Sequence, residues 1–270
     1  METLSFLAAP IALAVLLVAI HSYLGLHVLE RGVIFVDISL AQVAALGGTL
    51  SLYLTPEEGG PAHLLCSLFL CLFVAFLLAL LRHYERKISQ EVLIGITYAL
   101  ASGALILVAD RLPHGTEHLK EALVGNILFV TWPKVLETLA VYSVVGAIHY
   151  LFRKQFWACS RGELTSLVWD FLFYLLFGIV ITFSTAHAGV LVVFSILVVP
   201  AALACRLVQG LRAQLLLAWA IGVSEILVAF LLSYRLDLPA GASVVVTLTA
   251  SFFLALLVKI LYESKARSLP

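Results

Sequence analysis

The sequence predicts an all-helical membrane protein, a single transmembrane domain over residues 1–270 with about nine spans and a range of eight to ten. Apolar side chains make up 63% of the chain and charged ones only 12%, with a mean hydropathy of +1.10. Soluble domains are about a quarter charged. The net charge is zero, so no global field attracts a polyanion. This composition excludes a soluble enzyme, a disordered chain, a disulfide-stapled secreted domain and a nucleic-acid-binding protein.

Apolar runs separated by charged or Gly/Pro-bearing breaks define nine candidate spans, since a spanning helix needs about 20 apolar residues. In chain order they cover residues 6–26, 33–54, 62–81, 92–109, 133–152, 167–184, 189–205, 213–234 and 240–261. The first is expected to be a retained helix, because no basic region precedes it as in a signal peptide. The stretch 119–132 is only half apolar. It predicts a surface or re-entrant half-helix, closed by Pro133 at the start of the next span.

Basic residues set the expected orientation. Twelve of the sixteen Lys and Arg fall in one alternating set of connections: Arg31, Arg82, Arg86, Lys87, Arg153, Lys154, Arg161, Arg206, Arg212, Lys259, Lys265 and Arg267. The positive-inside rule places this set in the cytoplasm. The N-terminus is then outside and the C-terminus cytoplasmic, whereas an eight-span chain would move the N-terminus.

Nucleotide-binding and hydrolytic motifs are absent from the sequence. It contains no G-x-x-x-x-G-K-[ST], no H-E-x-x-H and no G-x-S-x-G, which are the signatures of P-loops, zinc proteases and α/β-hydrolases. We therefore expect a transport subunit that is not an enzyme and binds no cofactor of its own. Its energy source and any soluble receptor are expected to be other polypeptides.

Five stretches resemble, in order, the ABC-type metal permeases of the zinc, manganese and iron uptake class. The second span matches that family's signature in GLHVLERGVIFVDISLAQVAALGG at 25–48. The others are QEVLIGITYALASGALIL at 90–107, GTEHLKEALVGNIL at 115–128, the paired late spans at 169–204, and SYRLDLPAGASVVV at 233–246. Each stretch alone is a weak apolar pattern, but five in the right order cover most of the chain.

The resemblance implies a homodimeric permease in the bacterial plasma (inner) membrane. It implies two cytoplasmic ABC ATPase subunits, an extracellular or periplasmic metal-binding protein, and a path for a divalent metal or its chelate between the two copies. The alternative is a stand-alone secondary cation transporter or channel that uses Glu225 and Asp37 as a proton or cation relay.

Two departures from the family pattern affect the site. The family's second span commonly carries an Asp and, four residues on, a His. Here Asp37 is followed at that spacing by Ala41, with Gln42 beside it, and an amide suits a transition metal poorly. The cytoplasmic segment 153–168, which in relatives couples to the ATPase, is short. Its remaining charges Arg161 and Glu163 are predicted to contact the ATPase.

Asp37 and Glu225 are the candidate pathway carboxylates, together with Gln42 and His187. A carboxylate at mid-bilayer costs about 3 kcal/mol on insertion scales, so it must pair, hydrate or bind a cation. Asp37 shares a small-residue helical face that allows another helix to approach, made of Ala41, Ala44, Ala45 and Gly48. Its alternative roles are a hydrogen bond or an ion pair with Arg31. For Glu225 the alternative is a protonated acid bonded to Ser224 or to a neighbouring helix.

Histidines provide weaker candidates. His114 and His118 would share one face of a helix and form a workable metal pair, or Gly115 prevents a helix and the segment is a solvated loop. His187 lies in a tight turn before a Pro-containing short span, a feature that often marks transporter binding sites, or it simply caps the turn. His21 and Tyr23 are expected to be interfacial side chains.

Overall fold

The protein is described by a computed structural model that covers residues 2–55, 60–84, 87–113 and 115–267. Within these ranges the chain is helical and contains no strand. The elements are α1 Glu2–Arg31, α2 Val36–Ser51, α3 Pro61–Tyr84, α4 Gln90–Ala109, α5 Gly115–Val124, η1 Ile127–Phe129, α6 Trp132–Leu151, α7 Arg153–Ser160, α8 Leu167–Ala188, α9 Val190–Leu207, α10 Leu211–Leu236 and α11 Ala240–Arg267.

The predicted fold class is confirmed, and each of the nine predicted spans contains a helix. The predicted count of about nine spans is approximate. Seven helices are long and apolar enough to cross a membrane, and an eighth span results if α6 and α7, bent by 79°, are taken as one. The exception is α2, whose 16 residues extend about 24 Å at 1.5 Å each. A turn at Gly32, with φ of 66°, delays its start.

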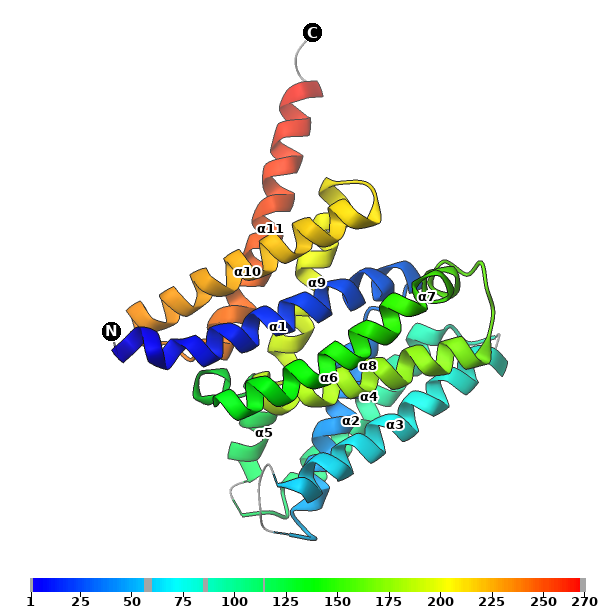
Figure 1. Ribbon diagram of the computed structural model, residues 1–270, viewed down its shortest axis with the longest axis vertical. Coiled ribbons are helices and arrows are strands. Elements are labelled where there is room, and N and C mark those ends of the chain that lie inside the picture. The colour runs from blue at the N-terminus through cyan, green and yellow to red at the C-terminus, as the bar shows by residue number, and fades with distance from the viewer. Residues whose placement is uncertain (1, 56–59, 85–86, 114, 268–270) are drawn as a thin grey trace.

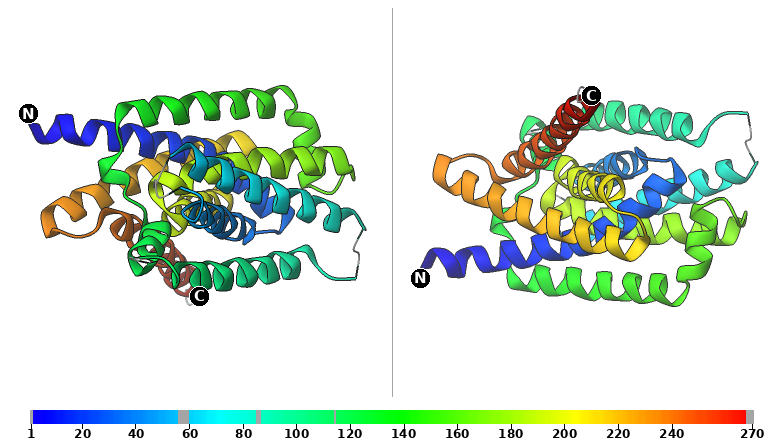
Figure 2. Two further views of the ribbon diagram at one scale, coloured as in Figure 1. Left: turned by 90° about the horizontal axis from the view of Figure 1, so that it is seen from below. Right: turned by 90° about the horizontal axis from the view of Figure 1, so that it is seen from above.

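Two helices run through the interior at a steep angle to their neighbours. In Figure 1, α1, α3, α6, α8 and α10 run broadly across the view, while α2 and α9 lie closer to the vertical long axis, pass between them and are seen nearly end-on in Figure 2. The inner helices contact most of the others: α2 packs against α3, α4, α8 and α9, and α9 packs against α1, α10 and α11. By contrast, α11 projects from the bundle (Figure 1), and only 11% of its most apolar stretch is buried.

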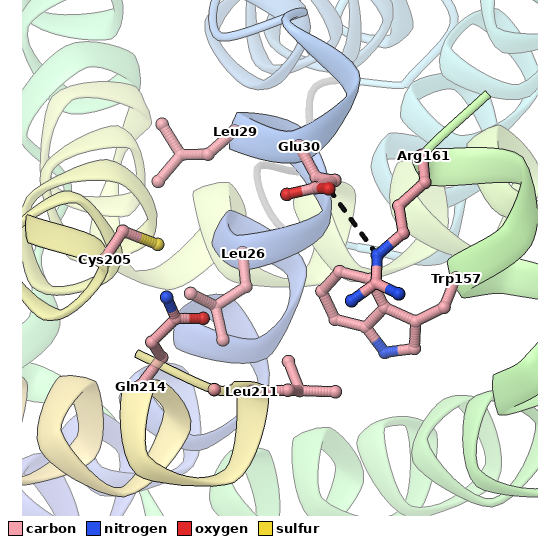
Figure 3. Close-up of a pocket in the computed structure, with 9 residues that line it drawn as sticks. Leu26, Leu29, Glu30, Trp157, Arg161, Cys205, Leu211 and Gln214 are labelled. Atoms are coloured by element: carbon pink, nitrogen blue, oxygen red, sulfur yellow. Dashed lines mark ion pairs between the residues drawn. The ribbon is translucent and has the colours of Figure 1, made fainter. Parts of the chain in front are cut away.

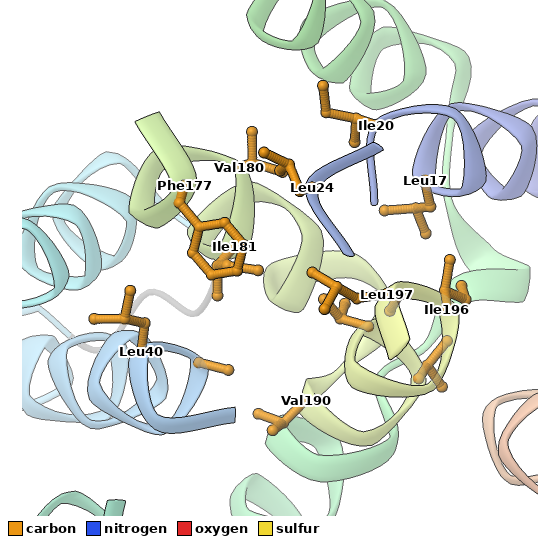
Figure 4. Packing of buried hydrophobic residues seen from close by; sticks show 14 of the residues in the cluster. Leu17, Ile20, Leu24, Leu40, Phe177, Val180, Ile181, Val190, Ile196 and Leu197 are labelled. Carbon is orange, nitrogen blue, oxygen red and sulfur yellow. The ribbon is translucent and has the colours of Figure 1, made fainter. Parts of the chain in front are cut away.

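The core lies where α1, α2, α8 and α9 converge (Figure 4). It is built from fully buried aliphatic and aromatic side chains, among them Leu17, Leu24, Leu40, Phe177 and Leu197. Close approach of α1 to α9 depends on Gly25, because a Cβ there would collide with the Leu197 carbonyl oxygen. Large apolar side chains on the outside, such as Phe69 and Phe73 of α3, suit contact with lipid.

Polar groups gather at two opposite ends of the bundle. We call one the Arg31 end, where α1 and α3 finish and α8 begins, and the other the His187 end, where α8 finishes and α6 begins. Trp132 and Pro133 open α6, and α5 with η1 forms the predicted half-helix before it. Arg31, counted above as a loop charge, is instead the last residue of α1 and its side chain is fully buried.

Candidate functional site

Asp37 lies in the first turn of α2 and is completely buried. Neither carboxylate oxygen has a hydrogen-bond partner among the described residues, and the same holds for the side-chain oxygen of Gln42. The alternative ion pair with Arg31 is wrong, because Arg31 Nη1 binds Asp170 Oδ1 at 2.8 Å. A buried carboxylate without a partner is costly unless it takes up a proton, a water or a cation. Asp37 is therefore suited to bind a cation.

A cavity of about 590 Å³ opens at the His187 end. Its lining comes mainly from α2, α3, α6 and α8 and is rich in polar side chains. These include Thr49, His63, Ser67, Asn126, Thr131, Lys134, Glu137, Thr182, Thr185 and His187. Ala44 and Ala45 of α2 also line it. Since Ala44 follows Asp37 by two helical turns, the cavity reaches the helix face that carries Asp37.

His63 is a cavity residue that the sequence analysis missed. Its imidazole packs directly on α2, where a Cβ built on Gly48 would lie 2.5 Å from His63 Cε1 and Nε2. Gly48 therefore makes the space that the ring occupies. The available signal was a histidine two residues after Pro61, at the start of an otherwise apolar helix, opposite the small-residue face of α2.

His187 occupies the last turn of α8 and lines the same cavity. The turn that follows contains Gly189, with φ of 77°, which packs against Gly125, with φ of 64°, from the connection between α5 and η1. The His187 carbonyl accepts a hydrogen bond of 3.2 Å from the Asn126 amide. Its backbone thus fixes the turn, while its imidazole makes no hydrogen bond to the described residues and can meet a ligand in the cavity.

Other predicted residues are placed elsewhere. Glu225 is half-buried on α10, which packs against α1, α9 and α11 rather than α2, so it does not share a site with Asp37. Its expected partner Ser224 donates instead to the Ile221 carbonyl at 2.9 Å.

The external histidine pair receives no support. His114 and the side chain of His118 lie outside the described residues. The expectation that Gly115 prevents a helix is wrong, since α5 begins there and continues to Val124. Within the described part of the chain, no three His, Cys, Asp or Glu side chains form a metal-binding group.

A second cleft, of about 390 Å³, lies at the Arg31 end (Figure 3). Arg161, just after α7, crosses it with Nε 3.6 Å from Glu30 Oε1, and its Nη1 lies 4.0 Å from Glu163 Oε1. The opposite wall comes from Cys205 at the end of α9 and from Gln214 of α10. The predicted coupling residues are thus neighbours: Arg161 lines this cleft, and Glu163 is exposed beside Arg161.

The bundle with a polar cavity above a buried carboxyl defines an integral membrane protein of the transporter type. The family model "ABC 3 transport family" matches residues 3–259. The chain belongs to this family.

Curated relatives agree with this assignment, and a solved structure shares the fold. A "probable metal transport system membrane protein" of Chlamydia trachomatis is 24% identical over 256 residues, covering 91% of this chain and 86% of that one. The manganese transport system membrane protein MntC of Listeria monocytogenes is 29% identical over 181 residues, 64% of each chain. A Chlamydia muridarum relative is matched over 62% of its length. The structure of PsaBC from Streptococcus pneumoniae in complex with Fab superposes with a TM-score of 0.76 at 21% identity, covering 94% of this chain and 92% of that one.

Proposed function

We propose that the chain is the permease subunit of an ATP-driven importer for a divalent metal ion, zinc, manganese or iron, or its chelate. The observation that carries this proposal is Asp37, a fully buried carboxyl without a described partner on the α2 face that the polar cavity reaches. Membership of the ABC 3 transport family and relatives named for manganese and iron transport support the substrate class.

The proposed route starts in the cavity at the His187 end and follows the small-residue face of α2 past Gln42 to Asp37. His63 and His187 offer imidazoles along this route. They supply the soft nitrogen ligands that the α2 sequence lacks at Ala41. The basic-residue asymmetry supports an external His187 end, with the N-terminus outside and the C-terminus in the cytoplasm.

The proposed partners are a second copy of this chain, two cytoplasmic ABC ATPase subunits and an external metal-binding protein. The chain has no P-loop motif, so ATP must be hydrolysed by another subunit. Arg161 and Glu163, exposed beside α7, are the proposed contact with the ATPase. The plasma membrane is the expected location.

Reconstitution into vesicles tests the energy source. The permease purified with its associated subunits should accumulate ⁵⁴Mn²⁺ or ⁶⁵Zn²⁺ only when ATP is present on the ATPase side. The permease alone, given the same ions and a proton gradient, should accumulate none. Proton-driven accumulation by the lone chain would support the secondary transporter instead, and Glu225→Gln would then identify whether that residue is the relay.

A further inference from the structure

Two buried histidines lie together beneath α7, away from the proposed route. His27 of α1 and His149 of α6 are at most 1% exposed, and their ring centroids are 6.0 Å apart. The Tyr23 ring packs against both, at 4.8 Å from His27 and 5.4 Å from His149. Two helices distant in the sequence, α1 and α6, therefore bring two imidazoles and a phenol into one cluster.

Hydrogen bonding around Ser160 favours one tautomer of His27. The Ser160 hydroxyl donates to the Phe156 carbonyl at 2.9 Å and accepts from Arg31 Nε at 3.0 Å, and its second lone pair is available to His27 Nδ1, 2.8 Å away. All three bonds form when His27 carries its proton on Nδ1, and its Nε2 then bears a lone pair. That Nε2 is buried and has no partner among the described residues. A ring nitrogen held by a hydrogen bond on its opposite side is the arrangement that orients histidine ligands of metals.

His149 adds a second free lone pair. Both of its ring nitrogens are buried without a described partner, and a neutral imidazole always has one nitrogen without a proton. The Tyr23 hydroxyl is likewise buried without a described partner. Asp170 lies 2.8 Å from Arg31 and 3.4 Å from Arg82, so its carboxylate offsets one of the two positive charges nearby.

We propose that His27 and His149, assisted by the Tyr23 hydroxyl, bind a divalent transition-metal ion such as zinc at the Arg31 end. With metal–nitrogen bonds of about 2.0–2.1 Å, two imidazoles on one ion have ring centroids about 5 to 6.5 Å apart. The observed 6.0 Å falls in this range. Imidazole ligands favour zinc and similar ions over magnesium or calcium.

The short helix α7 covers this site. Trp157 stacks on His27 at 4.0 Å and Phe156 stacks on His149 at 4.2 Å. Trp157 also lines the cleft at the Arg31 end (Figure 3), so its indole separates the cleft from the histidines. An ion entering from the cleft must displace this ring. An occupied site holds α1 and α6 together under α7, next to Arg161 and Glu163.

The consequence for transport rests on the proposed function. If α7 contacts the ATPase, metal accumulating in the cytoplasm fills the site, fixes α7 and slows further import. Metal binding itself does not depend on that function. Binding and transport are therefore measured separately.

Cobalt binding to the full-length protein in lipid nanodiscs tests the site. The visible absorption of Co²⁺ reports imidazole ligation, and Asp37→Asn provides a background without the proposed route. In that background we expect one tightly bound Co²⁺ per chain. His149→Phe, which keeps the ring stack on Phe156, should abolish it, whereas His83→Phe at the same end should retain it. Size-exclusion profiles show whether each variant is folded. If His149→Phe is not folded, His149→Gln takes its place.

Retention of the cobalt signal in the His149 variant would contradict the proposed metal site. Absence of the signal from the protein with His27, His149 and Tyr23 intact would contradict it as well. Loss of the signal with Asp37→Asn alone would assign it to the transport route instead. For regulation, zinc preloaded inside vesicles should slow ATP-driven uptake several-fold in the native protein but not in His149→Phe. Equal slowing of both would overturn the regulatory role, whereas a complete lack of uptake in every sample would count against the proposed import function.

Discussion

Arg31 and Asp170, 139 residues apart in the sequence, form a buried ion pair with Nη1 and Oδ1 2.8 Å apart. The Arg31 guanidinium also lies 3.9 Å above the Phe173 ring. Asp170 receives a second cation, Arg82, at 3.4 Å. This network ties the ends of α1 and α3 to the start of α8, and it explains why Asp37 is left without a cationic partner.

Asp170→Asn should strongly destabilise the protein. The substitution leaves a completely buried guanidinium without its counter-charge, and breaking a buried pair in this way costs about 3–5 kcal/mol. The Lys134–Glu137 pair has the same 2.8 Å separation, but its side chains are 46% and 38% exposed. Glu137→Gln should therefore cost about 0–1 kcal/mol. Melting temperatures of the purified proteins measure both effects. Equal decreases in melting temperature for the two variants would contradict a buried Arg31–Asp170 ion pair.

Gly47→Ala should disrupt the contact between α2 and α3. A Cβ there would lie 2.5 Å from the Cys66 carbonyl oxygen and 2.8 Å from Ser67 Cα, which are backbone atoms that cannot rotate away. We expect a lower melting temperature and a lower yield of folded protein. Gly103→Ala is the matched control in α4, since nothing lies within 4 Å of its Cβ. It should be neutral or stabilising by about 0.5–1 kcal/mol. A comparable loss of stability from both variants would contradict the close approach of α2 to α3 at Gly47.

Cysteine labelling tests the orientation. The background replaces the exposed Cys205 and half-buried Cys66. Single cysteines at Thr116 and Arg153, both exposed, then report the two ends. An impermeant thiol reagent applied outside intact cells should modify Thr116→Cys and leave Arg153→Cys unreacted until the membrane is opened. The reverse pattern would invert the topology.

Arg161→Ala combined with Glu163→Ala should uncouple ATP hydrolysis from transport. Arg161 lines the cleft beside α7 and Glu163 is its exposed neighbour, and no other charge lies between Lys154 and Asp170. The variant should insert normally but lose substrate-stimulated ATPase activity in the assembled complex. Arg153→Ala with Lys154→Ala removes two exposed charges from the same segment and should keep it. Unchanged stimulation in the first variant would move the contact to the Arg206–Arg212 connection.

The sequence predicts the helices well because long apolar runs determine them locally. It overestimates α2, since the turn at Gly32 and the early end at Ser51 depend on packing against α3 and α4. The sequence analysis also expects His21 to be an interfacial side chain near the membrane surface. The structure buries that ring completely, and Nδ1 contacts the Leu17 carbonyl while Nε2 contacts Ser184.

The site is less predictable because its partners come from distant segments. Asp37 stands out as a charge in an apolar span, but the pairing of Arg31 with Asp170 requires knowledge of how α1 meets α8. His63 becomes a cavity residue only because α3 packs on Gly48 of α2. The cluster of His27 and His149 joins α1 to α6, and no local pattern connects these two residues.

The central claim is that Asp37 carries the metal ion through the membrane. Its most direct test is ATP-driven ⁵⁴Mn²⁺ or ⁶⁵Zn²⁺ uptake by vesicles containing the complete transporter with Asp37→Asn or Glu225→Gln. The account predicts that Asp37→Asn, folded and inserted normally, reduces uptake to the level of empty vesicles, because the route loses its buried charge. Glu225→Gln, which lies on α10 away from the route, should retain most of the uptake. Full activity of Asp37→Asn together with an inactive Glu225→Gln would contradict the account.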